Sequence, residues 1–234
     1  MSQTTTVTFF KFKSVGSKLW ALSMMGLAHK SLRKINGQSF YKLMGSGRGL
    51  GFNAFPDWTT YVLLQVWESE EAAQTFFDSA KILQQYQKRT TEIWNVYLKN
   101  VSTHGQWDGH NPFHIEESLP STEIIVVLTR ATIKWHKLIP FWRYVPTSHQ
   151  PLKDNPGLIY TKGVGELPVI QMATLSIWKN KESLNNFAYS SREHREAIHM
   201  TRQLKWYKEE LFARFKPYKS VGTWEGENPI SYYL

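Results

Sequence analysis

The residue of this chain best suited to cofactor chemistry is a histidine on the inward face of a predicted helix. The sequence FAYSSREHREAIHMT predicts a helix with an inward stripe at spacings of three and four residues: Phe187, Ser191, His194, Ile198 and Thr201. His199 falls on another face with Arg195 and Arg202, so the two histidines cannot chelate one ion. A lone inward imidazole is either a hydrogen-bonded core residue or an axial ligand of haem iron, and the stripe leaves both open.

The remaining residues capable of chemistry form weaker patterns. His136, on the first predicted helix of the second half, is the second candidate imidazole. His104, His110 and His114 lie near one another, but a metal site needs further ligands at defined spacing, and Asp108 alone does not supply them. The chain has no cysteine, which excludes disulfides and thiolate ligands, and no serine in a G-x-S-x-G sequence.

A glycine-rich stretch, GSGRGLG at 45–51, matches no nucleotide-binding fingerprint. It lacks the G-x-G-x-x-G spacing that opens a helix and the G-K-S/T of a P-loop, and 52–58 contains a proline and is predicted as loop. The stretch is either a flexible connection between two strands or a lid over a pocket, with Arg48 available to an anionic group.

The predicted strands and helices that would position these residues occur in one order, and this order occurs twice along the chain. Strands are predicted at 6–13, 39–44, 60–67 and 93–107, and helices at 17–30 and 69–87. From Glu123 the order returns, with a helix that Pro140 breaks or kinks and Pro146 ends. YTKGVGELP corresponds to YKLMGSGRG, Trp178 to Trp67, and GTWEGENPI to GQWDGHNPF.

This repetition predicts an α+β fold of two tandem ferredoxin-like (βαββαβ) repeats, at 1–114 and 115–234. Each repeat has one sheet face to cover, so we expect the two sheets to pack face to face as a pseudo-dimeric α/β barrel with helices outside. The second repeat is longer: 40 residues separate Trp67 from Trp107, and 46 separate Trp178 from Trp224. The six extra residues fall in the segment that holds His194.

Charge, cysteine content and aromatic content limit the partners, the cellular location and the kind of ligand that we expect for this protein. The chain of 234 residues has a net charge of +9, but no run of Lys or Arg exceeds two and no nucleic-acid motif is present, so we do not expect nucleic acid as a partner. The lack of cysteine, of a signal sequence and of a membrane-length apolar run predicts a cytoplasmic protein. Aromatic residues are 15% of the chain, which suits a core or pocket around a bulky apolar group.

Several long motifs resemble the spheroidene monooxygenase family of carotenoid biosynthesis, within the haem-binding dimeric α/β-barrel type. They are LWALSMMGLAHKSL (19–32), FYKLMGSGRGLGF (40–52), YTKGVGELPVIQMATLSIW (160–178), HREAIHMTRQLKWYKEELFARF (194–215) and GTWEG (222–226). The resemblance implies a monooxygenase that uses haem b, dioxygen and an external electron donor such as a ferredoxin to make a keto product from an acyclic carotenoid. It also implies an axial histidine on a helix of the second repeat, which favours His194. Arg143 and Lys162 are then candidates for haem propionates or the distal side.

Two other functions stay open on this scaffold: a haem-dependent lyase of the aldoxime dehydratase type, and a non-enzymatic carrier of haem or another apolar ligand. A carotenoid substrate also suggests peripheral contact with a membrane. The segment 18–34 has an apolar centre with Lys18 at one end and Lys30, Arg33 and Lys34 at the other, which suits shallow burial at anionic headgroups.

Overall fold

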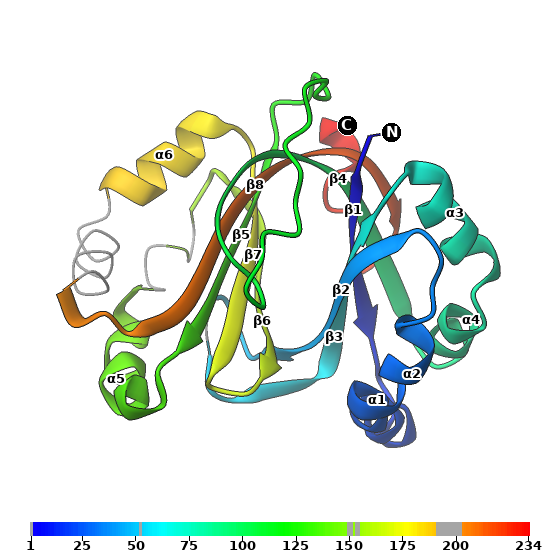
Figure 1. Ribbon diagram of the computed structural model, residues 1–234, viewed down its shortest axis with the longest axis horizontal. Coiled ribbons are helices and arrows are strands. Elements are labelled where there is room, and N and C mark those ends of the chain that lie inside the picture. The colour runs from blue at the N-terminus through cyan, green and yellow to red at the C-terminus, as the bar shows by residue number, and fades with distance from the viewer. Residues whose placement is uncertain (1, 52, 149–151, 153–154, 191–202) are drawn as a thin grey trace.

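The computed structural model describes residues 2–51, 53–148, 152, 155–190 and 203–234 (Figure 1). The strands within these ranges are β1 (Thr4–Lys11), β2 (Gln38–Gly47), β3 (Pro56–Trp67), β4 (Glu92–Gly105), β5 (Ile125–Ile133), β6 (Leu158–Leu167), β7 (Gln171–Trp178) and β8 (Tyr207–Gly222). The helices are α1 (Val15–Leu27), α2 (His29–Leu32), α3 (Glu70–Ser79), α4 (Lys81–Gln87), α5 (Leu138–Ser148) and α6 (Lys181–Ser190), with short 3-10 turns η1 (Trp135–Lys137) and η3 (Ser231–Tyr233).

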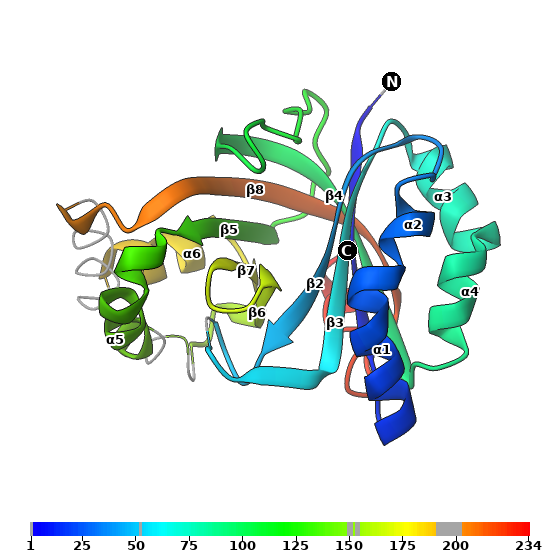
Figure 2. The ribbon, with the colours of Figure 1, turned by 60° about the horizontal axis from the view of Figure 1, so that its bottom comes forward.

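The strands form one closed antiparallel barrel in the order β1-β3-β2-β6-β7-β5-β8-β4. The predicted α+β class and single-chain barrel are confirmed. Hydrogen bonds join β2 to β6 and β4 to β8, so strands from the two halves of the chain pair at both seams. The helices lie outside the barrel: α1–α4 cover the sheet of the first half, and α5 and α6 lie beside that of the second half (Figures 1 and 2).

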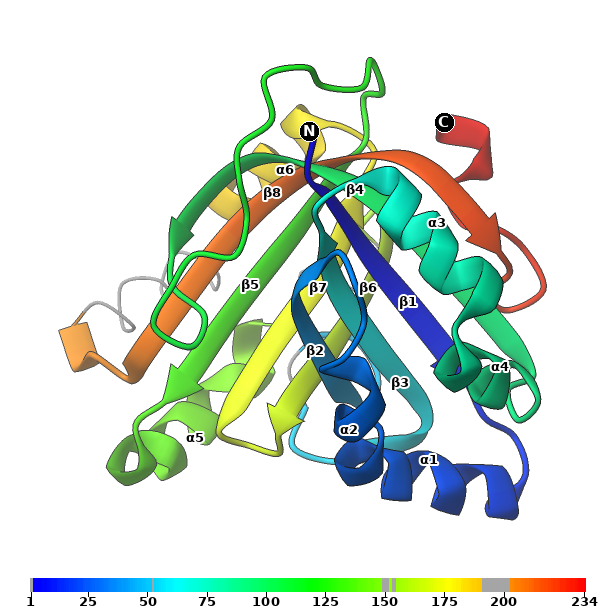
Figure 3. The same ribbon diagram turned by 45° about the vertical axis from the view of Figure 1, so that its right-hand side comes forward.

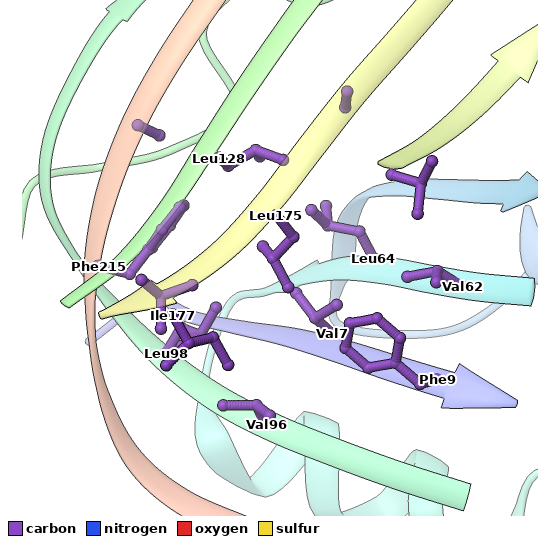
Figure 4. Packing of buried hydrophobic residues seen from close by; sticks show 14 of the residues in the cluster. Val7, Phe9, Val62, Leu64, Val96, Leu98, Leu128, Leu175, Ile177 and Phe215 are labelled. Atoms are coloured by element: carbon purple, nitrogen blue, oxygen red, sulfur yellow. The ribbon is translucent and has the colours of Figure 1, made fainter. Parts of the chain in front are cut away.

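Apolar side chains from all eight strands fill the barrel interior. Alternate residues of each strand point inward, as the period of two in a strand requires. Figure 4 shows Val7 and Phe9 of β1, Leu128 of β5, and Leu175 and Ile177 of β7 pointing toward one another. This interior is a packed core that joins the two halves.

The pairing registers of the two halves match over most of their length, up to Gly45 of β2 and Gly165 of β6. Trp67 faces Thr4 on β1, and Trp178 faces Ile125 on β5. We call positions equivalent when they have the same register relative to these two tryptophans. Gly45 of β2 is equivalent to Gly165 of β6, and these two glycines face each other across the seam.

The turns after β4 and β8 also have the same backbone conformation. Gly105 and Gly222 have φ of 91° and 89°, and each is followed by an isolated bridge, Trp107 to His110 and Trp224 to Glu227. A Cβ added to Gly105 would lie 2.1 Å from a backbone oxygen of β8, and one added to Gly222 would lie 2.0 Å from a backbone oxygen of β4. Both positions therefore require glycine for the approach of the partner strand.

Several details of the sequence-based prediction were wrong, among them the loop expected at 52–58, because β3 begins at Pro56. The helix expected at 69–87 is two helices, because Ala80 is extended with ψ of 120°. Pro146 does not end α5, which continues to Ser148, and Pro140 lies in the first turn, where its missing N–H costs no hydrogen bond. The alignment of β6 with β2 was off by one residue, because the register makes Lys162 equivalent to Lys42.

Candidate functional site

The outer face of the sheet β6-β7-β5-β8 carries two small apolar clusters at its two ends. One cluster lies under α6 and is built on Val127 and Trp178, with Leu184 and Phe187 from the helix. The other lies under α5 and comprises four buried residues and their partly buried neighbours: Ile133, Phe141, Met172 and Trp206. Figure 1 shows α5 and α6 at opposite ends of this face. The middle of the face belongs to neither cluster.

A central row of one glycine, two threonines and one phenylalanine separates the two clusters. Strand register places four residues side by side in this row: Gly163, Thr174, Thr129 and Phe212. They face outward, because their neighbours Leu128 and Leu175 lie in the barrel core. Thr129 and Thr174 are half-buried and Phe212 is exposed.

The equivalent row of the first half is filled and covered. It consists of Leu43, Leu63, Thr8 and Asn95, all buried. Leu43 and Leu63 belong to a single large outer cluster that packs against α1–α4. The second half has glycine and threonine at these two leucine positions, so side-chain volume has been removed from the middle of its outer face.

One cation adjoins the central row. Arg214 of β8 lies level with Val127, one row from Phe212, and its guanidinium carbon is 5.3 Å from the centre of the Phe212 ring. Its Nε is buried and has no hydrogen-bond partner in the part of the chain that is described. A buried N–H without a partner is costly, so Nε is a donor available to a ligand on this face.

The helical stripe centred on His194 lies outside the described residues, as do His199 and the stripe residues Ser191, Ile198 and Thr201. The residues on either side of this segment are described. Phe187, the first residue of the stripe, lies on α6 with its ring centre 5.0 Å from that of Trp178. Beyond the segment, Trp206 is buried in the cluster under α5. The described residues on either side of 191–202 therefore lie at the two ends of the outer face.

The other predicted site residues occupy varied environments. His136 is exposed on η1, with its ring centre 5.6 Å from that of Trp135. Arg143 is exposed on α5. Neither residue belongs to the central row.

Lys162 lies on the barrel side of β6, next to Gly163 of the central row. Its Nζ is 2.8 Å from Asp57 Oδ2 of β3. Burial by itself raises the pKa of the Asp57 carboxyl, but hydrogen bonds from Lys162 and Thr59 outweigh this effect and hold the pKa below its ordinary value. Lys162 is therefore already paired with the carboxylate of Asp57.

A second group of charged residues closes the barrel near the β2–β6 seam. Its members come from five separate elements: Lys42, Asp108, Arg130, Glu166 and Glu209. Lys42 Nζ lies 2.5 Å from Asp108 Oδ2 and also contacts Glu166, while Arg130 Nη1 lies 2.5 Å from Glu209 Oε1. The buried Arg130 is equivalent to Phe9 of β1. These ion pairs link both halves, so we assign the group a structural role.

The sequence-based prediction missed Arg214 and the central row. A signal for the row was present in the repeat: YVLLQVW against MATLSIW places Leu63 opposite Thr174. Comparing the repeats residue by residue could have identified the face from which a leucine is lost. Arg214 had no such signal, because only the pairing of β8 with β5 shows that it adjoins this face.

Two features are absent from the described residues. No helix there is long and apolar enough to cross a bilayer. No group of three or more His, Asp or Glu side chains there is arranged to hold a metal ion.

Solved structures with a similar fold include two aldoxime dehydratases. One matches with a TM-score of 0.65 at 11% identity over 98% of this chain and 86% of the other. The second, solved in complex with butyraldoxime, matches with a TM-score of 0.67 at 9% identity over 98% of this chain and 84% of the other. At this level of identity the likeness shows the fold alone.

Sequence relatives are more informative. No protein-family model matches the chain. It is 35% identical over 229 residues to a spheroidene monooxygenase of Cereibacter sphaeroides, covering 97% of this chain and 71% of the relative. It is 32% identical over 228 residues to that of Rhodobacter capsulatus, covering 96% and 94%. The chain is therefore an oxidoreductase and belongs to the spheroidene monooxygenase family.

Proposed function

We propose that this protein is a haem b-dependent monooxygenase that uses dioxygen to convert an acyclic carotenoid into a keto product, with electrons from an external donor such as a ferredoxin. The reaction class rests on the spheroidene monooxygenase relatives. The observation that supports a cofactor site in the second half is the central row, where glycine and threonine stand at the positions of Leu43 and Leu63.

The described residues of the outer face fit a flat, apolar cofactor with charged edges. The row Gly163, Thr174 and Thr129 has small side chains against the sheet, and the clusters under α5 and α6 would supply apolar contacts on both sides. Arg214 Nε is a donor toward the same face. When bound, haem would supply the binding and activation of dioxygen.

The protein's own residues would hold the cofactor and exclude water. His194 remains the proposed ligand to the haem iron, on the family resemblance and on its place in the sequence between α6 and β8, and His136 is the second candidate. Arg143 and Lys162 remain candidates for the propionates, although Lys162 is paired with Asp57 on the barrel side of β6 and would have to leave both Asp57 and that side to reach the outer face. A neutral imidazole donates less electron density than a thiolate, so hydrogen-bond donors such as Arg214 would matter more for oxygen activation.

We also propose that the chain is a tandem duplication of a ferredoxin-like unit, with repeats at 1–114 and 115–234. Support comes from the strand orders β2-β3-β1-β4 and β6-β7-β5-β8, which are the same in the two halves. The shared turn conformations at Gly105 and Gly222 add to it. On this view one repeat supplies a scaffold and the other has been modified to hold the cofactor.

Titration of the protein with haemin tests the cofactor site. We expect a Soret band that His194→Ala shifts or abolishes, because this substitution removes the proposed ligand to iron. His199→Ala is the matched control and should leave the band unchanged, because His199 is predicted on another face. An unchanged spectrum in His194→Ala would contradict the assignment, and the same titration of His136→Ala would then test the second candidate.

The reaction is tested with haem-loaded protein, an acyclic carotenoid, reductant and dioxygen. We expect a ketone, detected by its shifted absorption and its mass, and no product when dioxygen or reductant is left out. Dehydration of an aldoxime without consumption of dioxygen would instead show the lyase. Binding of the polyene without any turnover would show a carrier.

The carotenoid also determines where the protein must work. Such a substrate is dissolved in a bilayer, so we propose a cytoplasmic protein in peripheral contact with the membrane that contains it. The donor would deliver electrons from the aqueous side.

A further inference from the structure

Exposed large apolar residues gather at one end of the molecule. This end is the lower edge in Figures 1 and 3, where α1, the β2–β3 connection and η1 with α5 lie. On α1 the exposed residues Val15, Leu19 and Leu22 follow a spacing of four and three, so they form one outward stripe, opposite the buried Ala21 and Met24. Val15 is 73% exposed.

The neighbouring elements extend this surface. The β2–β3 connection and the start of β3 present Phe55, which is 69% exposed, and Trp58. On η1 and α5, Trp135 is 81% exposed and Ile139 is also exposed. We call this set the lower apolar end: Val15, Leu19, Leu22, Phe55, Trp58, Trp135 and Ile139. It draws on both halves of the chain.

The charge of the same segments has one sign. The stretches 12–35 and 133–143 contain no Asp or Glu. In 45–58 the one acid is Asp57, and its carboxylate is paired with Lys162. The cations of these stretches include Lys13, Lys18, Arg48, Lys134, Lys137 and Arg143. Apolar side chains on segments with such an excess of cations are complementary to an anionic bilayer.

We propose that the lower apolar end docks on the surface of an anionic bilayer, with its apolar residues in the headgroup region and its cations at the lipid phosphates. Exposed Trp135 and Trp58 suit this depth, because indole rings favour the membrane interface. This surface would be the site of the membrane contact in the proposed function, on which the proposal rests. Its support comes from exposure and charge alone. It can therefore be tested without haem, donor or carotenoid.

Co-sedimentation of the full chain with lipid vesicles tests the surface. We expect binding to vesicles that contain phosphatidylglycerol, weak binding to pure phosphatidylcholine, and release at high salt, because exposed charges are screened over about 10 Å at 0.1 M salt. The double substitution Phe55→Ser and Trp135→Ser should weaken binding to anionic vesicles about tenfold or more, since two apolar side chains leave the interface. Lys13→Glu with Arg48→Glu should weaken it by a similar factor.

Matched controls carry the same changes far from this end. Ile115→Ser with Tyr232→Ser alters two exposed apolar residues, one of them 95% exposed, in the loop after β4 and near the C-terminus. Lys179→Glu with Lys181→Glu reverses two exposed charges at the start of α6. Both controls should bind anionic vesicles as the unchanged protein does.

Three outcomes would overturn the proposal. Equal binding to neutral and anionic vesicles, or binding to neither, would show that the charge complementarity has no role. Equal loss in the matched controls would show a general effect of charge or polarity. Dimers that the Phe55 and Trp135 changes convert to monomers, as measured by light scattering, would show that a second copy of the chain covers this end. None of these results would bear on haem binding or on carotenoid oxidation.

Discussion

The outer faces of the two sheets have the same geometry and different contents. In the first half, Leu43 and Leu63 occupy the middle of the face and belong to one continuous cluster under four helices. In the second half, Gly163 and Thr174 stand at these positions, and the apolar residues divide into two clusters, one under each helix. A shared backbone can thus serve two purposes when a few side chains in the middle of a face change size.

The difference separates stability from ligand binding. Each leucine fully buried on the first face stabilises the fold by roughly 1.5–3 kcal/mol, because its apolar surface leaves water. The second face lacks such contributions at two positions, where glycine and threonine stand in place of leucine. The buried Nε of Arg214 has no hydrogen-bond partner among the described residues, which adds a further cost that a bound ligand would offset.

The largest expected effect concerns the barrel interior, where Arg130 is equivalent to Phe9. Arg130→Met should lower the free energy of unfolding by about 3–5 kcal/mol, because Glu209 would stay partly buried without its guanidinium partner. Adding Glu209→Gln should recover a substantial part of this loss. Urea denaturation measures both variants, and a double variant as unstable as the single one would mean that the ion pair is not the cause.

The next effect exchanges residues between the two outer faces. Leu63→Thr should destabilise the protein by about 2–4 kcal/mol, because it leaves a cavity and a hydroxyl in a closed cluster. The reverse change, Thr174→Leu, should leave thermal stability unchanged or raise it slightly, but should weaken haem binding in a Soret titration by filling the proposed site. Unaltered haem affinity in Thr174→Leu would show that haem does not bind at the central row.

A smaller effect is expected in the turns after β4 and β8, which have the same backbone conformation. Gly105→Ala and Gly222→Ala should each cost about 1–3 kcal/mol, since both residues have positive φ and a Cβ would meet a partner-strand oxygen at 2.1 Å and 2.0 Å. Thermal unfolding should show two similar losses. Alanine at Gly109, which also has positive φ but no atom within 4 Å of the added Cβ, is the control and should cost less.

The smallest effect is the acid response of the Asp57–Lys162 ion pair. The folded pKa of Asp57 is lowered from an unfolded value of about 3.9, so its contribution is complete above that value and is lost as the pH falls through the folded pKa. We expect Asp57→Asn to cost no more than about 1 kcal/mol at pH 6 and to reduce the loss of stability between pH 5 and 3. A steeper acid loss in the variant would contradict the lowered pKa.

Much of the fold could be predicted from local patterns. Alternating apolar residues such as Leu211, Ala213 and Phe215 fix which face of a strand is inward, and the recurrence of Trp67 as Trp178 reveals the repeated order. The break at Ala80 was not predictable, because alanine is a good helix former and its extended conformation reflects how α3 and α4 pack on the sheet. An error of one residue in aligning β6 with β2 was enough to exchange the faces of Lys162 and Gly163.

The sequence by itself determined the chemistry available to this protein: no thiolates, an abundance of aromatic residues, a cationic balance, and His194 on a helical stripe that is predicted to face inward. Only the tertiary structure decided which residues meet. Lys42 contacts Glu166, 124 positions away in the chain, and Phe212 and Arg214 reach the central row only through the pairing of β8 with β5. Periodicity is a local property, whereas these contacts depend on the register at which strands pair when the barrel closes.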